Sequence, residues 1–191
     1  MKTASVTEAA EALRGGWVIL VPTETVVGLV SSEAGLSRIQ RMKRRDPIKA
    51  VAFLCSSSEE AFALARNVPP LAEKLAETYW PGPLTLVLDA PEGGTVGVRV
   101  PDHTAVQTLL TAFGGPLYAT SANLAGEPAP ASIADVDLRV SGEVDLILFG
   151  EPGSGEASAV VDLSDGKIEL LRASPQLTEE RLRRLAAKPV P

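Results

Sequence analysis

Short apolar runs bounded by turn residues are the main pattern in the first part of the chain. Residues 17–21, 26–30 and 50–54 read WVILV, VVGLV and AVAFL. Continuous apolar runs of this length, rich in valine, are typical of buried strands. The turn PTET (residues 22–25) separates the first two runs, and residues 33–43 have helical spacing. The pattern predicts a strand, a tight turn, a second strand, a short helix and a third strand.

Helix start and stop signals predict the other helical segments. Ser5 and Glu8 fit a capping box, in which each side chain satisfies a backbone N–H group at the helix start. Glycine pairs follow residues 14 and 113, where they are suited to end a helix. We expect helices over residues 9–14, from a cap at Ser57 or Ser58 to residue 66, and over 71–79, 104–113 and 178–187.

The remaining strands decide the fold class. We expect them over residues 84–88, 95–100, 117–120, 145–149, 158–163 and 167–172. The glycine pair after residue 92 and the Asp-Gly step after residue 164 predict two hairpins, so the sheet is mixed rather than purely parallel. The chain is therefore expected to be α/β (α+β), one domain over residues 1–191. Residues 150–155 (GEPGSG) are the most flexible stretch by composition and could act as a lid.

Composition and charge exclude several classes of protein. The formal net charge of −6 argues against a dedicated nucleic-acid binder, because such proteins neutralise phosphates with a basic surplus. The single cysteine, Cys55, excludes an internal disulfide framework, and the single histidine, His103, excludes a histidine-rich metal site. No apolar run is long enough to span a bilayer, and the N-terminus lacks a signal-peptide pattern. We expect a cytoplasmic protein without membrane association.

Four cations near hydroxyl-bearing strand ends make the strongest candidate site for a phosphate-bearing small molecule. They are Lys43, Arg44, Arg45 and Lys49. Two interpretations stay open, because cations at a helix C-terminus also complement the helix dipole. The absence of a P-loop, a G-x-G-x-x-G turn and a G-x-S-x-G elbow argues against hydrolases and dehydrogenases.

Polar residues at other predicted strand ends have two interpretations as well. Thr23 and Thr25 alternate along an extended segment, so their hydroxyls share a face, either for a ligand or for the local backbone. Ser121 and Asn123 form either a turn or a binding pair. Arg99 lies among valines and either faces solvent or reaches an anion.

Six sequence blocks, in order, resemble the Sua5/YrdC/YciO family of threonylcarbamoyl-adenylate synthases. They are PTETVVGL (22–29) followed by KRR (43–45) and Lys49, WPGPLT (80–85), VRVPDH (98–103), TSANL (120–124) with Gly126, SAVVD (158–162), and Leu171-Arg172. The resemblance covers nearly the whole chain, to about residue 172, in the short form that lacks the C-terminal domain of longer members. It implies a YrdC/RibB-like fold, a large twisted mixed sheet with surrounding helices and a concave central cavity.

The resemblance also implies an activity. Such an enzyme makes threonylcarbamoyl-AMP from L-threonine, bicarbonate or CO2, and ATP, with Mg2+ bound to the triphosphate and with release of pyrophosphate. The product goes to a downstream tRNA threonylcarbamoyl transferase for N6-threonylcarbamoyladenosine at position 37. A weak contact with tRNA or double-stranded RNA is a further expectation.

The same resemblance implies roles for individual residues. Lys43 and Arg45 become the catalytic phosphate ligands, and Lys49 becomes a weaker ATP ligand. Asn123 and Arg172 are implied as further ATP ligands. The implied L-threonine ligands are Thr23, Thr25, Arg99, Ser121 and Ser158. No residue is implied as a metal ligand.

The chain departs from the family pattern at several positions. Val27 replaces a common aromatic residue, Asp46 a common proline, Leu54 a histidine found in some relatives, and Ala159 the threonine of a Ser-Thr pair. Two alternatives therefore stay open: a module of this fold that binds double-stranded RNA or tRNA, and a divergent YciO-type paralogue that acts on another nucleotide.

Overall fold

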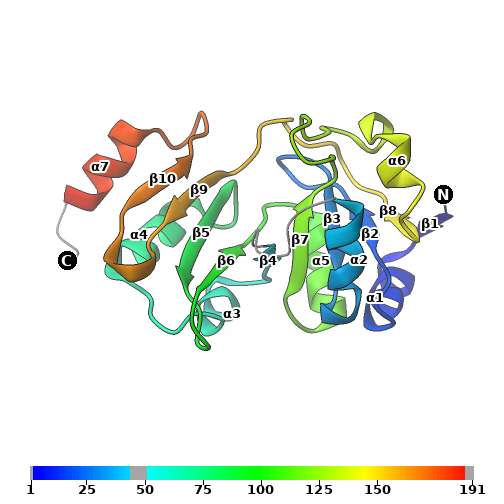
Figure 1. Cartoon of the computed structure of the whole chain (residues 1–191), viewed down its shortest axis with the longest axis horizontal. Coiled ribbons are helices and arrows are strands. Elements are labelled where there is room, and N and C mark those ends of the chain that lie inside the picture. The colour runs from blue at the N-terminus through cyan, green and yellow to red at the C-terminus, as the bar shows by residue number, and fades with distance from the viewer. Residues whose placement is uncertain (1, 44–50, 188–191) are drawn as a thin grey trace.

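The computed structural model describes residues 2–43 and 51–187. Within these residues, ten strands form a single sheet in the order β1-β8-β2-β3-β7-β4-β6-β5-β9-β10. The strands are β1 (Lys2–Ala4), β2 (Ile19–Val21), β3 (Gly28–Ser31), β4 (Ala52–Leu54), β5 (Leu84–Asp89), β6 (Thr95–Arg99), β7 (Leu117–Ser121), β8 (Leu146–Leu148), β9 (Ala159–Asp162) and β10 (Glu169–Arg172). Strands β1 and β10 are the two edges, at opposite ends of the molecule (Figure 1).

Helices pack on both sides of this sheet. The described α-helices are α1 (Val6–Arg14), α2 (Leu36–Met42), α3 (Ser58–Ala63), α4 (Pro70–Tyr79), α5 (Thr104–Phe113), α6 (Leu138–Ser141) and α7 (Glu179–Ala187). Helices α3, α4 and α7 lie with β5, β6, β9 and β10, whereas α1, α2, α5 and α6 lie around β2, β3, β7 and β8 (Figure 1). None of the described helices is long and apolar enough to cross a membrane.

The mixed sheet confirms the predicted fold class. Strand pairs β5–β6 and β9–β10 are the two expected hairpins, and both are antiparallel. Strands β4 and β6 pair in parallel, as do β5 and β9. Among the strands of residues 2–43 and 51–187, the predictions missed only β1, a three-residue strand that pairs in parallel with β8. Its sequence, KTA, has no strand pattern. The segment is a strand only because it pairs with a distant part of the chain, which local sequence does not reveal.

Strand β2 is buried on both faces, which explains its continuous apolar sequence. Ile19 and Val21 pack with α1 and α5 on one face, whereas Leu20 packs with α2 and α6 on the other. The predicted strand was too long at its start. Trp17 precedes β2 and is 45% exposed, because the chain enters the sheet only after the turn at Gly16, whose φ is 78°.

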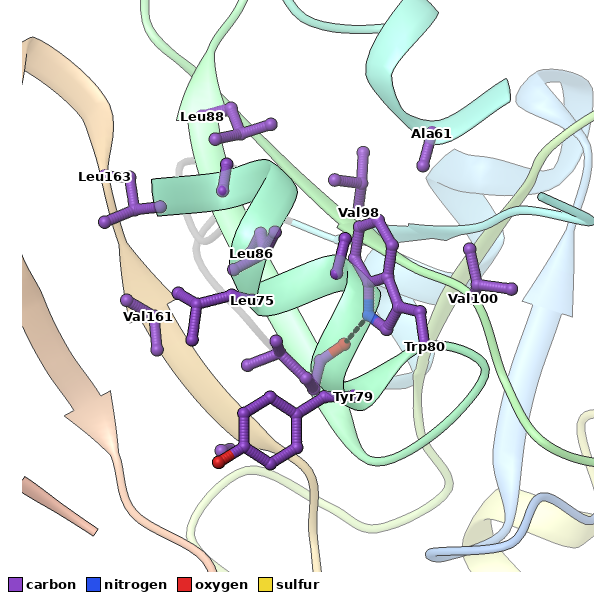
Figure 2. Packing of buried hydrophobic residues seen from close by; sticks show 14 of the residues in the cluster. Ala61, Leu75, Tyr79, Trp80, Leu86, Leu88, Val98, Val100, Val161 and Leu163 are labelled. Atoms are coloured by element: carbon purple, nitrogen blue, oxygen red, sulfur yellow. Dashed lines mark hydrogen bonds between the residues drawn. The ribbon is translucent and has the colours of Figure 1, made fainter. Parts of the chain in front are cut away.

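Strand β5 is covered on one face only, and this asymmetry creates the site. Leu84, Leu86 and Leu88 point into a core with α3 and α4 (Figure 2). The indole of Trp80 donates a hydrogen bond to the Leu84 carbonyl at 2.7 Å within this core. The alternate residues of the strand, including Thr85, face the opposite side of the sheet. No helix of the described residues fills that side, so it stays open as a cavity.

Local signals set most helix boundaries as predicted. Ser5 and Glu8 form the expected capping box at α1. Ser57, rather than Ser58, caps α3, which ends at Ala63 instead of residue 66. Gly114 ends α5 in a left-handed conformation with φ of 84°. His103 occupies the position before α5, where its ring makes no capping hydrogen bond and contacts the Glu151 carbonyl instead.

Candidate functional site

A cavity of about 560 Å³ opens on the uncovered face of the sheet. Strands β3, β4, β5, β6 and β7 form its floor, and Ala157, Ser158, Val160 and Arg172 close one side. Among the residues predicted for the site, the structure brings six to the lining of this cavity: Thr23, Arg99, Ser121, Asn123, Ser158 and Arg172. Residues from distant parts of the chain therefore converge on one concave surface, in keeping with the concave cavity that the family resemblance implied.

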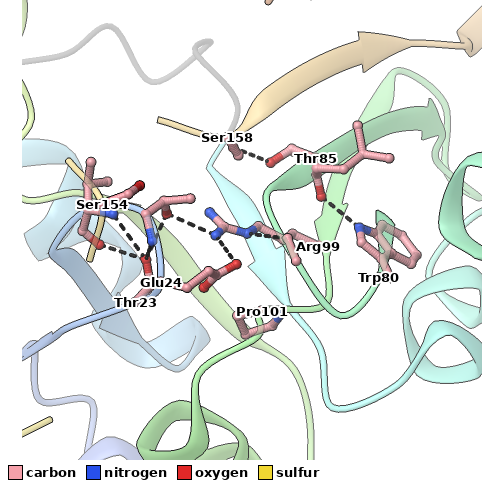
Figure 3. A network of polar contacts seen from close by, with 12 residues as sticks. Thr23, Glu24, Trp80, Thr85, Arg99, Pro101, Ser154 and Ser158 are labelled. Carbon is pink, nitrogen blue, oxygen red and sulfur yellow. Dashed lines mark hydrogen bonds and ion pairs between the residues drawn. The ribbon is translucent and has the colours of Figure 1, made fainter. Parts of the chain in front are cut away.

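Arg99, at the end of β6, is held by the turn that precedes β3 (Figure 3). Its Nη2 donates to Glu24 Oε1 at 2.6 Å and to Thr25 Oγ1 at 2.9 Å. Its Nε donates to the Gly82 carbonyl at 3.2 Å. The side chain is buried, with 8% exposure, yet it lines the cavity. Of the two interpretations left open for Arg99, the one in which it faces solvent is therefore wrong.

Thr23 and Thr25 share a face as predicted, with their hydroxyl oxygens 2.8 Å apart. Thr23 Oγ1 also donates to the Val26 carbonyl and accepts from the Thr25 and Val26 N–H groups, so it organises the turn. Thr23 lines the cavity, whereas Thr25 is 1% exposed and supports Arg99 from behind. The turn therefore has a structural role in addition to any contact with a ligand.

Lys43, just after α2, holds the segment that follows β7. Its ammonium donates to the Ser121 carbonyl at 2.6 Å, to Asn123 Oδ1 at 2.8 Å and to the Asn123 carbonyl. Lys43 is 1% exposed, and Ser121 Oγ donates to the same Asn123 Oδ1 at 2.5 Å. This contact network fixes two predicted ligands, Ser121 and Asn123, against the cavity.

Ser158, Thr85 and Arg172 make a second polar group on the opposite wall. The hydroxyls of Ser158 and Thr85 lie 3.0 Å apart (Figure 3). Arg172 donates from Nε to the Ser158 carbonyl at 2.7 Å and from Nη2 to Ser158 Oγ at 3.2 Å. A guanidinium oriented beside two hydroxyls is suited to bind an anion.

Three of the predicted cations lie outside the described residues. They are Arg44, Arg45 and Lys49. Their assignment as phosphate ligands, like that of Asp46 as a departure from the family pattern, rests on the sequence alone.

Sequence reasoning missed three residues of this region. Thr85 alternates with the leucines of β5, and successive side chains of a strand point to opposite faces. This alternation could have placed Thr85 on the face opposite the leucines, which is the cavity face. Glu24 belongs to a quoted motif, but its pairing with Arg99 over 75 residues of sequence had no signal. Glu127 lines the cavity rim, where its carbonyl accepts from Asn123 Nδ2 and its carboxylate pairs with Arg139 at 3.0 Å.

The 150–155 loop is docked on the turn that holds Arg99. Ser154 N–H donates to the Glu24 carbonyl at 3.0 Å, and Gly155 N–H donates to the Thr25 carbonyl at 2.8 Å. Gly153 lies so close that a Cβ atom there would approach the Thr25 and Thr23 carbonyl oxygens to 2.3 and 2.4 Å. The predicted lid is thus a loop packed against the site in this structure.

Two groups in this part of the molecule, Asp137 and Cys55, have pKa values shifted by their surroundings. Hydrogen bonds from Arg139 lower the pKa of Asp137 to about 2, so the ion pair at the rim is fully charged at neutral pH. Burial raises the pKa of the Cys55 thiol, which follows β4, to about 12. Cys55 is therefore a protonated core residue at neutral pH.

The departures from the family pattern lie in different environments. Val27 is fully buried against α2 and α6, and Ala159 is buried under α4, so neither lines the cavity. Leu54 does line it. Among the described departures, Leu54 is thus the one that alters the cavity wall.

Comparison with known proteins finds relatives over most of the chain. The Sua5/YciO/YrdC family model, described as "Telomere recombination", matches residues 11–174. A threonylcarbamoyl-AMP synthase of Pyrococcus abyssi is 37% identical over 185 residues, which cover 90% of this chain and 54% of that protein. One of Chromohalobacter salexigens is 34% identical over 85% of this chain and 94% of its own length.

Solved structures agree with these sequence relatives. Pyrococcus abyssi Sua5 in complex with L-threonine has a TM-score of 0.87 and 33% identity, and the alignment covers 95% of this chain and 57% of that one. Escherichia coli YciO has a TM-score of 0.80 and 26% identity, with 89% of both chains covered. The chain thus spans little more than half the length of the Pyrococcus abyssi protein and most of the length of YciO.

Proposed function

This chain belongs to the Sua5/YciO/YrdC family, and on that premise we propose that it is an L-threonylcarbamoyladenylate synthase. The enzyme would make threonylcarbamoyl-AMP from L-threonine, bicarbonate or CO2, and ATP. The observation that carries the proposal is the convergence of two arginines, Arg99 and Arg172, on one cavity that also contains Ser121, Asn123 and Ser158. Such a cavity suits a ligand with separate anionic groups, such as an amino acid beside a nucleotide.

The reaction needs alignment more than a protein nucleophile. The amine of L-threonine adds to CO2 and loses a proton to give a carbamate. A carbamate oxygen then attacks the α-phosphate of ATP, and the bond to the leaving pyrophosphate breaks. Fixed cations and hydroxyls can stabilise the charge that develops on the phosphates, and a rigid cavity can hold the carbamate in line with the α-phosphate.

We assign the ligands by the chemistry of each wall. Arg99 binds the carboxylate of the amino acid, and the hydroxyls of Thr23, Ser121 and Ser158 are further ligands of the amino acid. Thr25 belongs to this group through its hydrogen bond to Arg99. Arg172 takes a phosphate group, as does Asn123, whose amide Lys43 orients.

The phosphate ligands proposed from sequence complete the ATP site. Lys43 and Arg45 are the catalytic cations in this proposal, with Lys49 as a further ATP ligand. The ammonium of Lys43 bonds to carbonyl oxygens in the present structure. Its role at the phosphates therefore includes holding Asn123 in place.

Mg2+ would enter with ATP as part of the substrate. Across residues 2–43 and 51–187, no group of three or more His, Cys, Asp or Glu side chains is placed to hold a metal ion. Phosphate oxygens and water would supply the Mg2+ ligands. We assign no step of the reaction to a metal held by the protein.

The product would pass to a tRNA threonylcarbamoyl transferase that modifies adenosine 37. Direct binding of tRNA or double-stranded RNA would be weak and confined to a local basic patch, because the chain carries a formal net charge of −6. We place the protein in the cytoplasm on the basis of this role in tRNA modification.

The deciding assay is release of pyrophosphate from ATP with Mg2+. Release that requires both L-threonine and bicarbonate, with L-serine as the control amino acid, is the expected result. Well-folded protein that releases no pyrophosphate under these conditions would contradict the proposal.

A second candidate is a YciO-type paralogue that acts on another nucleotide. The structural similarity to Escherichia coli YciO, with a TM-score of 0.80, and the apolar Leu54 on the cavity wall favour it. A screen of nucleotides for binding by calorimetry would separate the two, since the synthase would prefer ATP and gain affinity for it with L-threonine.

A further inference from the structure

The two members of the Glu24–Arg99 ion pair line different cavities. Arg99 lines the main cavity, whereas Glu24 lines a second cavity of about 550 Å³ together with His103 and Glu151. Among the described residues, the lining of the main cavity includes Arg99 but not Glu24. Glu24 therefore holds Arg99 from the side away from the proposed substrates.

The hydrogen bonds of Arg99 define one orientation of its guanidinium. Nη2 is bound by Glu24 Oε1 at 2.6 Å and by the Thr25 hydroxyl, and Nε is bound by the Gly82 carbonyl. These contacts occupy Nε and Nη2, so Nη1 is the nitrogen that remains for a ligand in the cavity. A planar guanidinium held at two nitrogens cannot rotate without breaking a hydrogen bond.

Glu24 makes this contact at an energetic cost. Its Oε2 is buried and accepts no hydrogen bond from any described residue. A buried carboxylate oxygen without a donor is unfavourable, and removing one member of a buried ion pair leaves the other charge uncompensated.

The backbone that carries Glu24 is held firmly. The Glu24 carbonyl accepts from Ser154 N–H, and the next carbonyl, that of Thr25, accepts from Gly155 N–H. The carboxylate thus projects from a turn fixed by the 150–155 loop, and it can impose its position on Arg99.

From this geometry we propose that Glu24 is a positioning residue for the amino-acid subsite. It orients the guanidinium of Arg99 so that the edge exposed to the main cavity meets the carboxylate of the amino-acid substrate. The proposal rests on the proposed function and adds to it a residue that contacts Arg99 but no substrate.

The kinetic test compares Glu24→Gln and Glu24→Asp with the wild-type protein. Glu24→Gln keeps an oxygen acceptor but removes the charge. We expect it to raise the KM for L-threonine by about tenfold or more, as the loss of a charge-assisted hydrogen bond implies, while the KM for ATP stays within about twofold. Glu24→Asp should retain most of the affinity, because it restores the charge.

Asp145→Asn is the matched control. It removes another ion pair of the same length, the 2.6 Å contact between Arg38 of α2 and Asp145 just before β8, and should leave both KM values unchanged. Equal KM for L-threonine in Glu24→Gln and the wild-type protein would overturn the proposal, as would an equal rise in the KM for ATP.

A measurement on the ligand-free protein keeps this test independent of the activity. In ¹⁵N-edited NMR spectra, we expect slow rotation of the Arg99 guanidinium in the wild-type protein and faster rotation in Glu24→Gln, with Arg99→Lys identifying the signal. The same rotation rate in both proteins would refute the positioning role. If the wild-type protein releases no pyrophosphate but shows this difference, only the proposed function fails.

Discussion

The ammonium of Lys43 donates a hydrogen bond to the side-chain oxygen of Asn123 at 2.8 Å, although 80 residues separate the two in sequence. The contact ties the end of α2 to the segment after β7, and the same ammonium also binds the Ser121 carbonyl. One buried cation thus orders the segment that carries two proposed ligands.

Lys43→Ala and Arg45→Ala should each weaken the use of ATP more than Arg44→Ala does. Lys43→Ala removes both a proposed phosphate ligand and the contact that fixes Asn123. The expected readout is a rise in the KM for ATP, or a fall in kcat, of about tenfold or more for a lost charge-assisted contact. The measurement is pyrophosphate release over a range of ATP concentrations. Equal effects of all three variants would contradict the assignment of the phosphate ligands.

Thr85→Val tests a residue that only the structure identified. The change is nearly isosteric, but it removes the hydroxyl that lies 3.0 Å from Ser158 Oγ in a buried position. We expect a loss of about 1 kcal/mol of unfolding free energy, measured by urea denaturation, and a severalfold higher KM for L-threonine. Thr108→Val, on the exposed face of α5, is the control and should change neither value. Similar effects of both variants would remove Thr85 from the site.

Gly153→Ala tests the docking of the 150–155 loop. The new Cβ atom would lie 2.3 Å from the Thr25 carbonyl oxygen, so either the loop or the turn must move. We expect a loss of about 1–3 kcal/mol of unfolding free energy and a raised KM for L-threonine, because the turn that holds Arg99 shifts.

Gly115→Ala is the matched control for this change. No atom lies within 4 Å of the Cβ atom it would introduce, and it should be neutral in both measurements. A Gly153→Ala protein that kept the stability and KM of the wild type would show that the loop does not support the site.

The fold was largely predictable because it follows from local patterns. The alternation in β5, the capping box at Ser5 and the hairpin glycines each act over a few residues. Strand β1 was not predictable, because its three residues become a strand only through pairing with β8. Trp17 was placed in a buried strand because its apolar neighbours continue into β2, yet its own ring is exposed.

The site was predictable as a set of residues but not as a network of contacts. Sequence reasoning selected Arg99 and Ser158, and the structure brings both to the cavity wall. It could not predict that Glu24 binds Arg99 or that Lys43 binds Asn123, since these contacts depend on how distant strands are arranged in the sheet. Of the described positions at which the chain departs from the family pattern, Leu54 lines the cavity, whereas Val27 and Ala159 are buried away from it.

The thiol of Cys55 gives a pH dependence of stability with a defined sign. Its pKa is about 12 in the folded protein, mainly because of burial, against a value of 9.0 for an unperturbed thiol. The folded state therefore keeps a proton that the unfolded state loses, so this contribution is complete below about pH 9 and is lost as the pH rises towards 12.

We expect the free energy of unfolding to fall by about 1 kcal/mol between pH 9 and 10 from this group. The tyrosines Tyr79 and Tyr118, whose pKa values burial also raises, add smaller losses of the same sign in this interval and larger ones above pH 10. Urea denaturation at each pH measures the slope, and Cys55→Ala should lower the starting stability but flatten the slope in this interval. An equal slope in both proteins would mean that the thiol keeps an ordinary pKa in the fold.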